Sequence, residues 1–147
     1  MFKDPRVPWD TVKSGTAVAK ARDGKTNFFQ QKLTALSSPV PLGVGQELLV
    51  LRAEASLRGG DIAGMTTLLN QARVTYTGLA PLTAPTTTAA AWTLVQSERG
   101  ATVWLEARRL WDMRRWFAEG TDTLLTGRNK CLQISDNEYA SNPNLHQ

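Results

Sequence analysis

The chain has one cysteine, one histidine and no long apolar run, and each scarcity excludes a class of protein. The lone Cys131 rules out an internal disulfide framework and a paired-cysteine metal site. The single His146 is the penultimate residue. We expect this chain end to be mobile, and a mobile histidine is poorly placed to act as a general base. Without an apolar run of about 18 residues, no membrane-spanning helix is predicted.

The motifs that carry common enzyme chemistry are also missing. We find no Ser-His-Asp arrangement, no cluster of metal ligands and no glycine-rich phosphate loop. Glu98 and Glu106 could lie two turns apart on one helix face, as a pair of catalytic carboxylates would, but they serve equally well as ion-pair partners. We therefore expect a binding protein rather than an enzyme, with no cofactor and no metal.

Composition and charge describe a water-soluble globular chain. Apolar residues make up 41% and charged residues 20% of the sequence, which separates it from disordered chains. Residues 1–45 contain seven Lys and Arg against three Asp, which accounts for the whole net charge of +4. A modest excess on a loop-rich segment is weak support for a polyanion partner, so we expect no nucleic-acid binding.

The distribution of proline and glycine divides the sequence into two regions near residue 45. Residues 1–45 hold four prolines and show no helical period, which predicts an irregular, loop-rich segment with a short extended stretch at "NFFQQKL". Residues 46–147 form the second region, in which helical spacing predicts helices at about 46–58, 61–76 and 89–118. The fold class is therefore mainly α, with an irregular C-terminal tail.

The first two helices are predicted to form an antiparallel hairpin. In "QELLVLRAEASLR" the apolar face is predicted from Leu48, Leu51 and Ala55, with Leu49 and Ala53 beside it, and Gly59-Gly60 ends the helix. Asp61 then caps the second helix. Its predicted buried face consists of Ile62, Met65, Leu69, Ala72 and Tyr76.

This hairpin has the size of one tetratricopeptide unit, although an ordinary helical hairpin fits the spacing as well. A single such unit cannot bury its own apolar face and must stack on neighbours. We therefore expect further helices, a partner or self-association to cover that face.

Residues 97–117, "SERGATVWLEARRLWDMRRWF", combine three tryptophans with five arginines. They read as one long helix with the preceding residues, or as two helices joined near Ala107. The charges find partners at helical spacing, in the pairs Glu106–Arg109, Arg108–Asp112 and Asp112–Arg115. The remaining arginines can extend beside the tryptophans. The pattern therefore favours a helix that packs in the core over a helix that binds nucleic acid.

Three segments, in the same order, resemble the SusD/RagB family of nutrient-binding outer-membrane lipoproteins. The family's "ER…E…EG.R..D.RRW" is matched by Glu98-Arg99, Glu106, Arg109, Asp112 and Arg114-Arg115-Trp116. Its "E..LIRAEA.L..G" is matched by Glu47, Arg52, Ala53, Glu54, Ala55 and Gly60. Its closing "L.PIP..E...NPNL.Q" is matched by Leu132, Ile134, Glu138, Asn142, Pro143, Asn144, Leu145 and Gln147. The start "FKDPRVPW" is similar to the family's upstream "DPR".

The sequence also departs from the family pattern. Thr102 replaces a Glu, and Ala107 replaces a Gly, which predicts a softer kink at that point. Gln133 and Ser135 replace the two prolines of the closing motif. Family members are longer, with a signal peptide, a lipid-anchored cysteine and further helices, none of which this chain shows. We therefore expect it to correspond to the C-terminal part of such a protein.

The resemblance implies a cell-surface protein of the outer membrane that binds an oligosaccharide or other nutrient and works with a TonB-dependent transporter. Aromatic faces would hold the sugar, because pyranose C–H faces are apolar. Trp9, Phe28 and Phe29 are the candidate ligand-binding residues, although their more ordinary role would be to cover the helices. The alternative function is a tetratricopeptide-like protein–protein interaction module.

Overall fold

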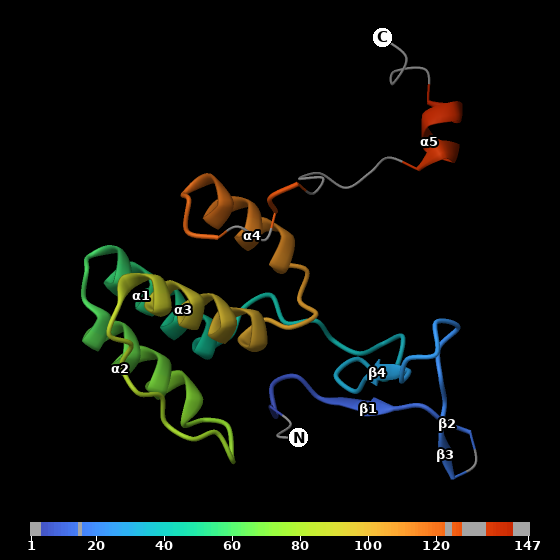
Figure 1. Cartoon of the computed structure of the whole chain (residues 1–147), viewed down its shortest axis with the longest axis horizontal. Coiled ribbons are helices and arrows are strands. Elements are labelled where there is room, and N and C mark those ends of the chain that lie inside the picture. The colour runs from blue at the N-terminus through green and yellow to red at the C-terminus, as the bar shows by residue number, and fades with distance from the viewer. Residues whose placement is uncertain (1–3, 15, 123–124, 128–134, 143–147) are drawn as a thin grey trace. The chain divides into compact units, whose positions relative to one another are not determined.

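The computed structural model describes residues 4–14, 16–122, 125–127 and 135–142 (Figure 1). These residues form five helices and four short strands, so the chain is mainly α as predicted. Its internal contacts divide it into two units, residues 1–109 and residues 110–147. Each unit is described by itself.

The first unit begins with a ribbon of short antiparallel strands. β1 (Trp9–Thr11) pairs with β4 (Phe28–Gln30), and β2 (Lys13–Ser14) pairs with β3 (Ala17–Val18). β4 lies within the predicted extended stretch "NFFQQKL". The other three strands were not predicted, because strands of two or three residues are too short to show an alternating pattern.

The helical hairpin follows. α1 (Gly45–Arg58) ends where the Gly59 N–H donates to the Ala55 carbonyl, and Gly60 adopts a left-handed φ of 82°. α2 (Ile62–Arg73) begins at Asp61, whose side chain accepts a hydrogen bond of 2.7 Å from the Gly64 N–H. The predicted Asp61 cap is therefore confirmed.

The core of the first unit lies between three helices, α1, α2 and α3 (Thr88–Thr102) (Figure 1). Its buried residues are Val50, Ala53, Leu57, Met65, Leu69, Ala72, Ala91 and Val95. The predicted face of α2 is confirmed at Met65, Leu69 and Ala72.

The predicted face of α1 is wrong at its centre, although Ala53, which was placed beside that face, is buried, and Leu49 is partly buried. Leu48 and Leu51 are 63% and 39% exposed, whereas Glu47 and Glu54 are buried beside the apolar core residues. Apolar side chains surround this helix on most sides, so spacing alone leaves its orientation open. The burial of the two carboxylates selects the other face, since both pair with arginines: Glu47 with Arg99 and Glu54 with Arg58.

The long C-terminal stretch consists of two helices. Thr87 caps α3 by accepting from the Ala90 N–H, and α3 ends at Thr102. The chain then turns through residues 103–108 before α4 (Arg109–Ala118) begins. Of the two interpretations that the sequence left open, the one with a junction near Ala107 is correct.

In the second unit, arginines lie against tryptophans along α4. The Arg114 guanidinium is 5.1 Å from the Trp111 ring and that of Arg115 is 5.4 Å from the Trp116 ring. Arg115 also pairs with Asp112 at 3.3 Å, as the helical spacing predicted. These arginines therefore act in packing and ion pairing.

The predicted irregular tail contains a helix of six residues, α5 (Asp136–Ser141), capped by the Ser135 hydroxyl. Cys131, His146 and most of the closing motif lie outside the described residues, as does Gln133. Within the described part, no helix is long and apolar enough to cross a membrane.

Candidate functional site

Glu98 of α3 is the centre of a buried ion-pair cluster. Two nitrogens of Arg6 donate to its carboxylate, Nη1 to Oε2 at 2.7 Å and Nη2 to Oε1 at 3.3 Å. From α2, Arg73 Nη1 donates to Oε1 at 2.6 Å. Arg6 also binds Asp4 at 2.7 Å. The "DPR" segment near the start of the chain is thus tied to two helices.

These contacts shift the pKa values of the groups involved. The hydrogen bond from Arg6 lowers the pKa of Asp4 below its ordinary value of 3.8. Burial alone would lower the pKa of Arg6, but its bonds to Asp4 and Glu98 outweigh burial and raise it. Tyr76, whose ring lies 5.9 Å from the Arg6 guanidinium, has its pKa raised by burial. Asp4 and Arg6 are therefore both charged at neutral pH.

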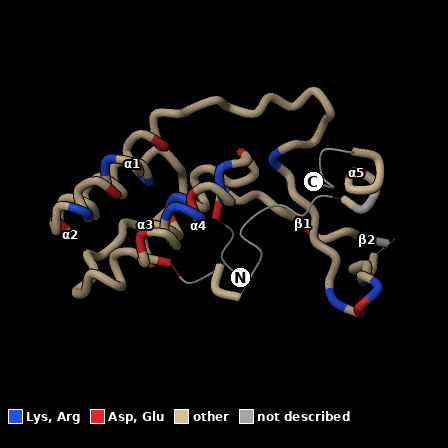
Figure 2. Tube along the Cα trace, turned by 90° about the horizontal axis from the view of Figure 1, so that it is seen from above, with Lys and Arg blue, Asp and Glu red and all other residues tan. Residues whose placement is uncertain are grey.

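A second ion-pair cluster holds the turn between α3 and α4. Lys32 Nζ donates to Glu106 Oε1 and to the Trp104 carbonyl oxygen, both at 2.7 Å. Arg108 lies 3.4 Å from the Glu47 carboxylate of α1. Figure 2 shows acidic and basic positions together along the helices of this part of the chain. Glu106 and Glu98 are each bound by cations, which supports the ion-pair interpretation of these two carboxylates.

The turn itself has an unusual backbone. Leu105 and Ala107 have φ values of 59° and 58°, in the left-handed region that side chains disfavour. The prediction of a softer kink at Ala107 is therefore wrong, because the chain makes the sharp turn with alanine in place of glycine. The Lys32 and Arg108 contacts stabilise the conformation.

Helical spacing fails as a guide to ion pairs across this turn. Glu106 lies in the turn rather than in a helix, so the predicted Glu106–Arg109 pair does not form, and Glu106 binds Lys32. The local sequence gives no sign that Lys32 binds Glu106, because the two residues are separated by 74 positions.

The predicted ligand-binding aromatics lie on the ribbon. Trp9 and Phe28 contact edge to face, with ring centroids 5.0 Å apart. Phe28 is 57% exposed and Phe29 is 43% exposed, so they do not serve mainly to cover the helices. The strand register places Phe28 opposite Thr11 and Phe29 opposite Asp10, and neighbouring residues of a strand point to opposite faces. The structure thus joins Trp9 with Phe28 and separates both from Phe29.

A hollow of about 440 Å³ adjoins Phe29 on the ribbon. The other residues that line it are Asp10, Thr11, Val12 and Lys13. An aromatic ring beside a carboxylate, a hydroxyl and an ammonium group is the combination that binds the apolar face and the hydroxyls of a sugar.

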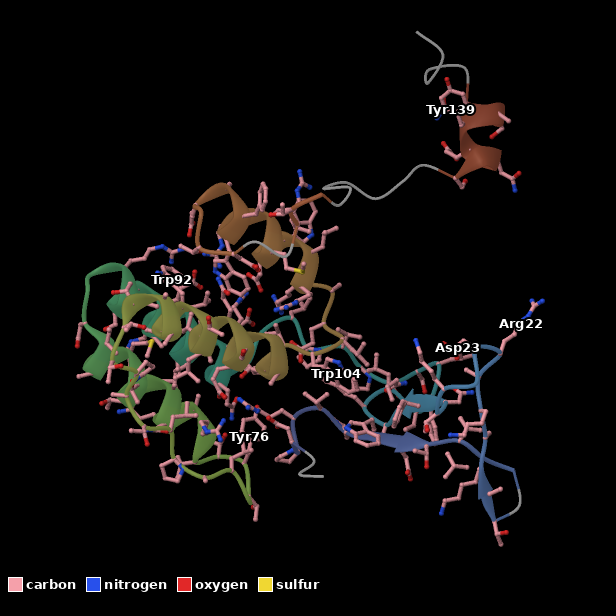
Figure 3. All side chains as sticks on the ribbon, viewed as in Figure 1. Arg22, Asp23, Tyr76, Trp92, Trp104 and Tyr139 are labelled. Atoms are coloured by element: carbon pink, nitrogen blue, oxygen red, sulfur yellow. The ribbon has the colours of Figure 1, made fainter. Side chains whose placement is uncertain are left out.

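A second hollow, of about 520 Å³, lies along the C-terminal end of α3, where Figure 3 labels Trp104. It is lined by Val7, Ser97, Gly100, Ala101, Trp104, Leu105 and Arg109. Sequence reasoning missed it, because residues 97–117 with their tryptophans were interpreted as a packing helix and Arg109 was assigned to an ion pair. Within the described part of the chain, no group of three or more metal-ligating residues occurs.

The described residues form a helical scaffold tied by buried ion pairs, with exposed aromatics and open hollows on its surface. The family model of the SusD family matches residues 3–147, and the chain belongs to this family. Members of this family are nutrient-binding surface proteins of the outer membrane rather than enzymes. No curated protein and no solved structure matched the chain.

Proposed function

We propose that this chain binds an oligosaccharide, with the aromatics on the two faces of the ribbon as its contact residues. The observation that carries the proposal is the exposure of Phe28 and Phe29 on a paired ribbon, with Asp10 and Lys13 beside Phe29. A sugar ring stacked on Phe29 could donate hydroxyl protons to Asp10 and accept a hydrogen bond from Lys13. Trp9 contributes by fixing the Phe28 ring through their edge-to-face contact.

The ribbon is well suited to hold such a surface in place. Strand pairing fixes the backbone of β1 and β4, and Gln31 N–H donates to the Pro8 carbonyl at their end. At its start, the ribbon continues from the Arg6 segment that Glu98 anchors. A surface fixed before binding loses less conformational entropy when the ligand arrives.

The test is a calorimetric titration of neutral oligosaccharides against the wild type and two variants. Phe29→Ala and Phe28→Ala each remove an exposed ring, and we expect the affinity to fall about tenfold for a stacking contact. Val18→Ala is the matched control, since Val18 is an exposed apolar residue of the same ribbon. Unchanged affinity in both phenylalanine variants would refute the proposed surface.

The family assignment supports a TonB-dependent transporter as the partner and the outer cell surface as the location. We propose that the bound nutrient is passed to such a transporter. Copurification of the chain with a purified transporter of this class, with and without oligosaccharide, tests the partnership. Failure to associate in either condition would argue against it.

The second candidate function is a tetratricopeptide-like interaction module. The observation in its favour is the exposed stripe of Leu48, Leu51 and Ala55 on α1. Such a stripe binds a partner helix or a second copy of the chain. Leu48→Asp and Leu51→Asp would then abolish association measured by light scattering while leaving oligosaccharide affinity unchanged. Association that persists in both variants would exclude this face.

A further inference from the structure

The hollow beside Trp104 has a chemical character different from that of the ribbon. Its ring comes from Trp104, its only cation is Arg109, and no carboxylate is among the residues that line it. The inference drawn from this hollow extends the proposed oligosaccharide binding to a second contact and to a class of sugar.

Arg109 is the uncompensated arginine of this region. Arg6, Arg73 and Arg108 each have a carboxylate within 3.4 Å. Among the residues that the structure describes, by contrast, none forms an ion pair or hydrogen bond with Arg109. An exposed guanidinium has five N–H donors, and no residue that the structure describes occupies those of Arg109.

Gly100 makes room for this guanidinium. A Cβ at position 100 would lie 3.0 Å from Arg109 Nη1, closer than ordinary contact. The absence of a side chain therefore lets Arg109 lie along α3 at the hollow rather than extend away from it. Ser97, one turn earlier on the same helix, adds a hydroxyl to the lining.

The turn fixes Trp104 and Arg109 at the two ends of one short segment. Lys32 holds the Trp104 carbonyl at 2.7 Å, and the left-handed residues Leu105 and Ala107 define the path to Arg109. A strained turn that tertiary contacts hold in place is often found at ligand sites. The turn thus sets the backbone positions of Trp104 and Arg109.

We propose that this hollow binds a carboxylated sugar residue of an oligosaccharide. The apolar face of the sugar stacks on Trp104, and its carboxylate accepts hydrogen bonds from Arg109. A planar carboxylate matches the fork of a guanidinium in a bidentate pair.

The test compares oligogalacturonides with the same oligosaccharides after complete methyl esterification, which removes the charge and keeps the sugar rings. The wild type should bind the free acids about five- to tenfold more tightly at low salt, and the preference should shrink as salt rises. Arg109→Gln should abolish the preference and leave the affinity for the ester unchanged. Gly100→Ala requires Arg109 Nη1 to shift by a few tenths of an ångström and should change the preference less than Arg109→Gln does.

Matched controls separate this contact from general electrostatics. Arg52→Gln removes one exposed positive charge from α1 and should leave the preference intact. Trp104→Phe should keep most of the affinity, and Trp104→Ala should lower it for both ligands. Circular dichroism and thermal unfolding establish that each variant is folded.

Three results would overturn the inference. Equal affinity for acid and ester in the wild type excludes a carboxylate contact, and a preference that persists in Arg109→Gln excludes Arg109 as its partner. In either case, binding of neutral sugars through Phe28 and Phe29 would leave the proposed function standing. A wild type that binds no oligosaccharide of either kind would overturn both.

Discussion

Arg6 and Glu98 are 92 residues apart in the sequence and share two hydrogen bonds in the interior of the first unit. Glu98 also binds Arg73, so one carboxylate joins the N-terminal segment to α2 and α3. Two of the segments that resemble the family, "DPR" and "ER", therefore meet at one point. Their residues stabilise the fold.

Removal of the Glu98 charge should destabilise the protein strongly. Glu98→Gln leaves the buried guanidinium of Arg6 and the largely buried one of Arg73 without their shared counter-ion, and such losses cost about 3–5 kcal/mol. Urea denaturation measures the change. Asp23→Asn breaks the exposed Lys25–Asp23 pair and serves as control, with an expected melting temperature equal to that of the wild type. Equal stability of the two variants would show that the Glu98 cluster contributes little.

The pH dependence of stability should report the Arg6–Asp4 contact. Because the pKa of Asp4 is lowered in the folded state, the contact stabilises the protein above pH 3.8 and is lost as pH falls through the folded-state pKa. Asp4→Asn should therefore lower stability at pH 7 and reduce the loss of stability below about pH 4. Thermal unfolding from pH 7 down to about pH 2 tests this. Parallel curves for variant and wild type would contradict it.

Ala107 should tolerate glycine better than any other substitution. At a φ of 58° the alanine Cβ is strained by about 1–2 kcal/mol, and glycine relieves this at an entropic cost of about 0.5–1 kcal/mol. Ala107→Gly should thus raise the free energy of unfolding by about 0.5–1 kcal/mol. Ala55→Gly, at an exposed position inside α1, should lower it by a similar amount. A loss of stability in Ala107→Gly would mean that the turn is not left-handed in solution.

Two buried threonines should respond differently to valine. Thr102 Oγ1 is buried and has no hydrogen-bond partner in the described part of the chain, whereas Thr66 Oγ1 donates to the Ile62 carbonyl at 2.8 Å. Thr102→Val should therefore be neutral or stabilising, since it removes an unsatisfied polar group. Thr66→Val should cost about 1 kcal/mol. Chemical denaturation of both variants measures the change in the free energy of unfolding. A larger loss of stability for Thr102→Val than for Thr66→Val would show that the Thr102 hydroxyl has a hydrogen-bond partner.

Local signals in the sequence were sufficient to predict α1 and the starts of α2 and α3. The predicted end of α2 at residue 76 is wrong, since α2 ends at Arg73, and α5 was not predicted. Gly60 and Asp61 act through their own backbone and the next few residues, so a pattern of neighbours identifies them. The orientation of α1 was not predictable in this way. It depends on Arg99, which meets Glu47 across 52 positions of sequence.

The candidate site was predictable only in part. Phe28 and Phe29 were identified as aromatics on a segment without helical period, and the structure shows them exposed. The Trp104 hollow depends on a left-handed turn at Leu105, a residue type that gives no sign of such a backbone. Long-range contacts from Lys32 hold that turn, and no local pattern contains them.

The most direct test measures stability and oligosaccharide affinity together in Phe29→Ala and Glu98→Gln. Phe29 is proposed to contact the ligand, whereas Glu98 stabilises the fold. We expect Phe29→Ala to lose affinity about tenfold with an unchanged melting temperature. Glu98→Gln should unfold at a much lower temperature yet bind normally where it is still folded. The reverse pattern, with affinity lost in folded Glu98→Gln and retained in Phe29→Ala, would contradict the account.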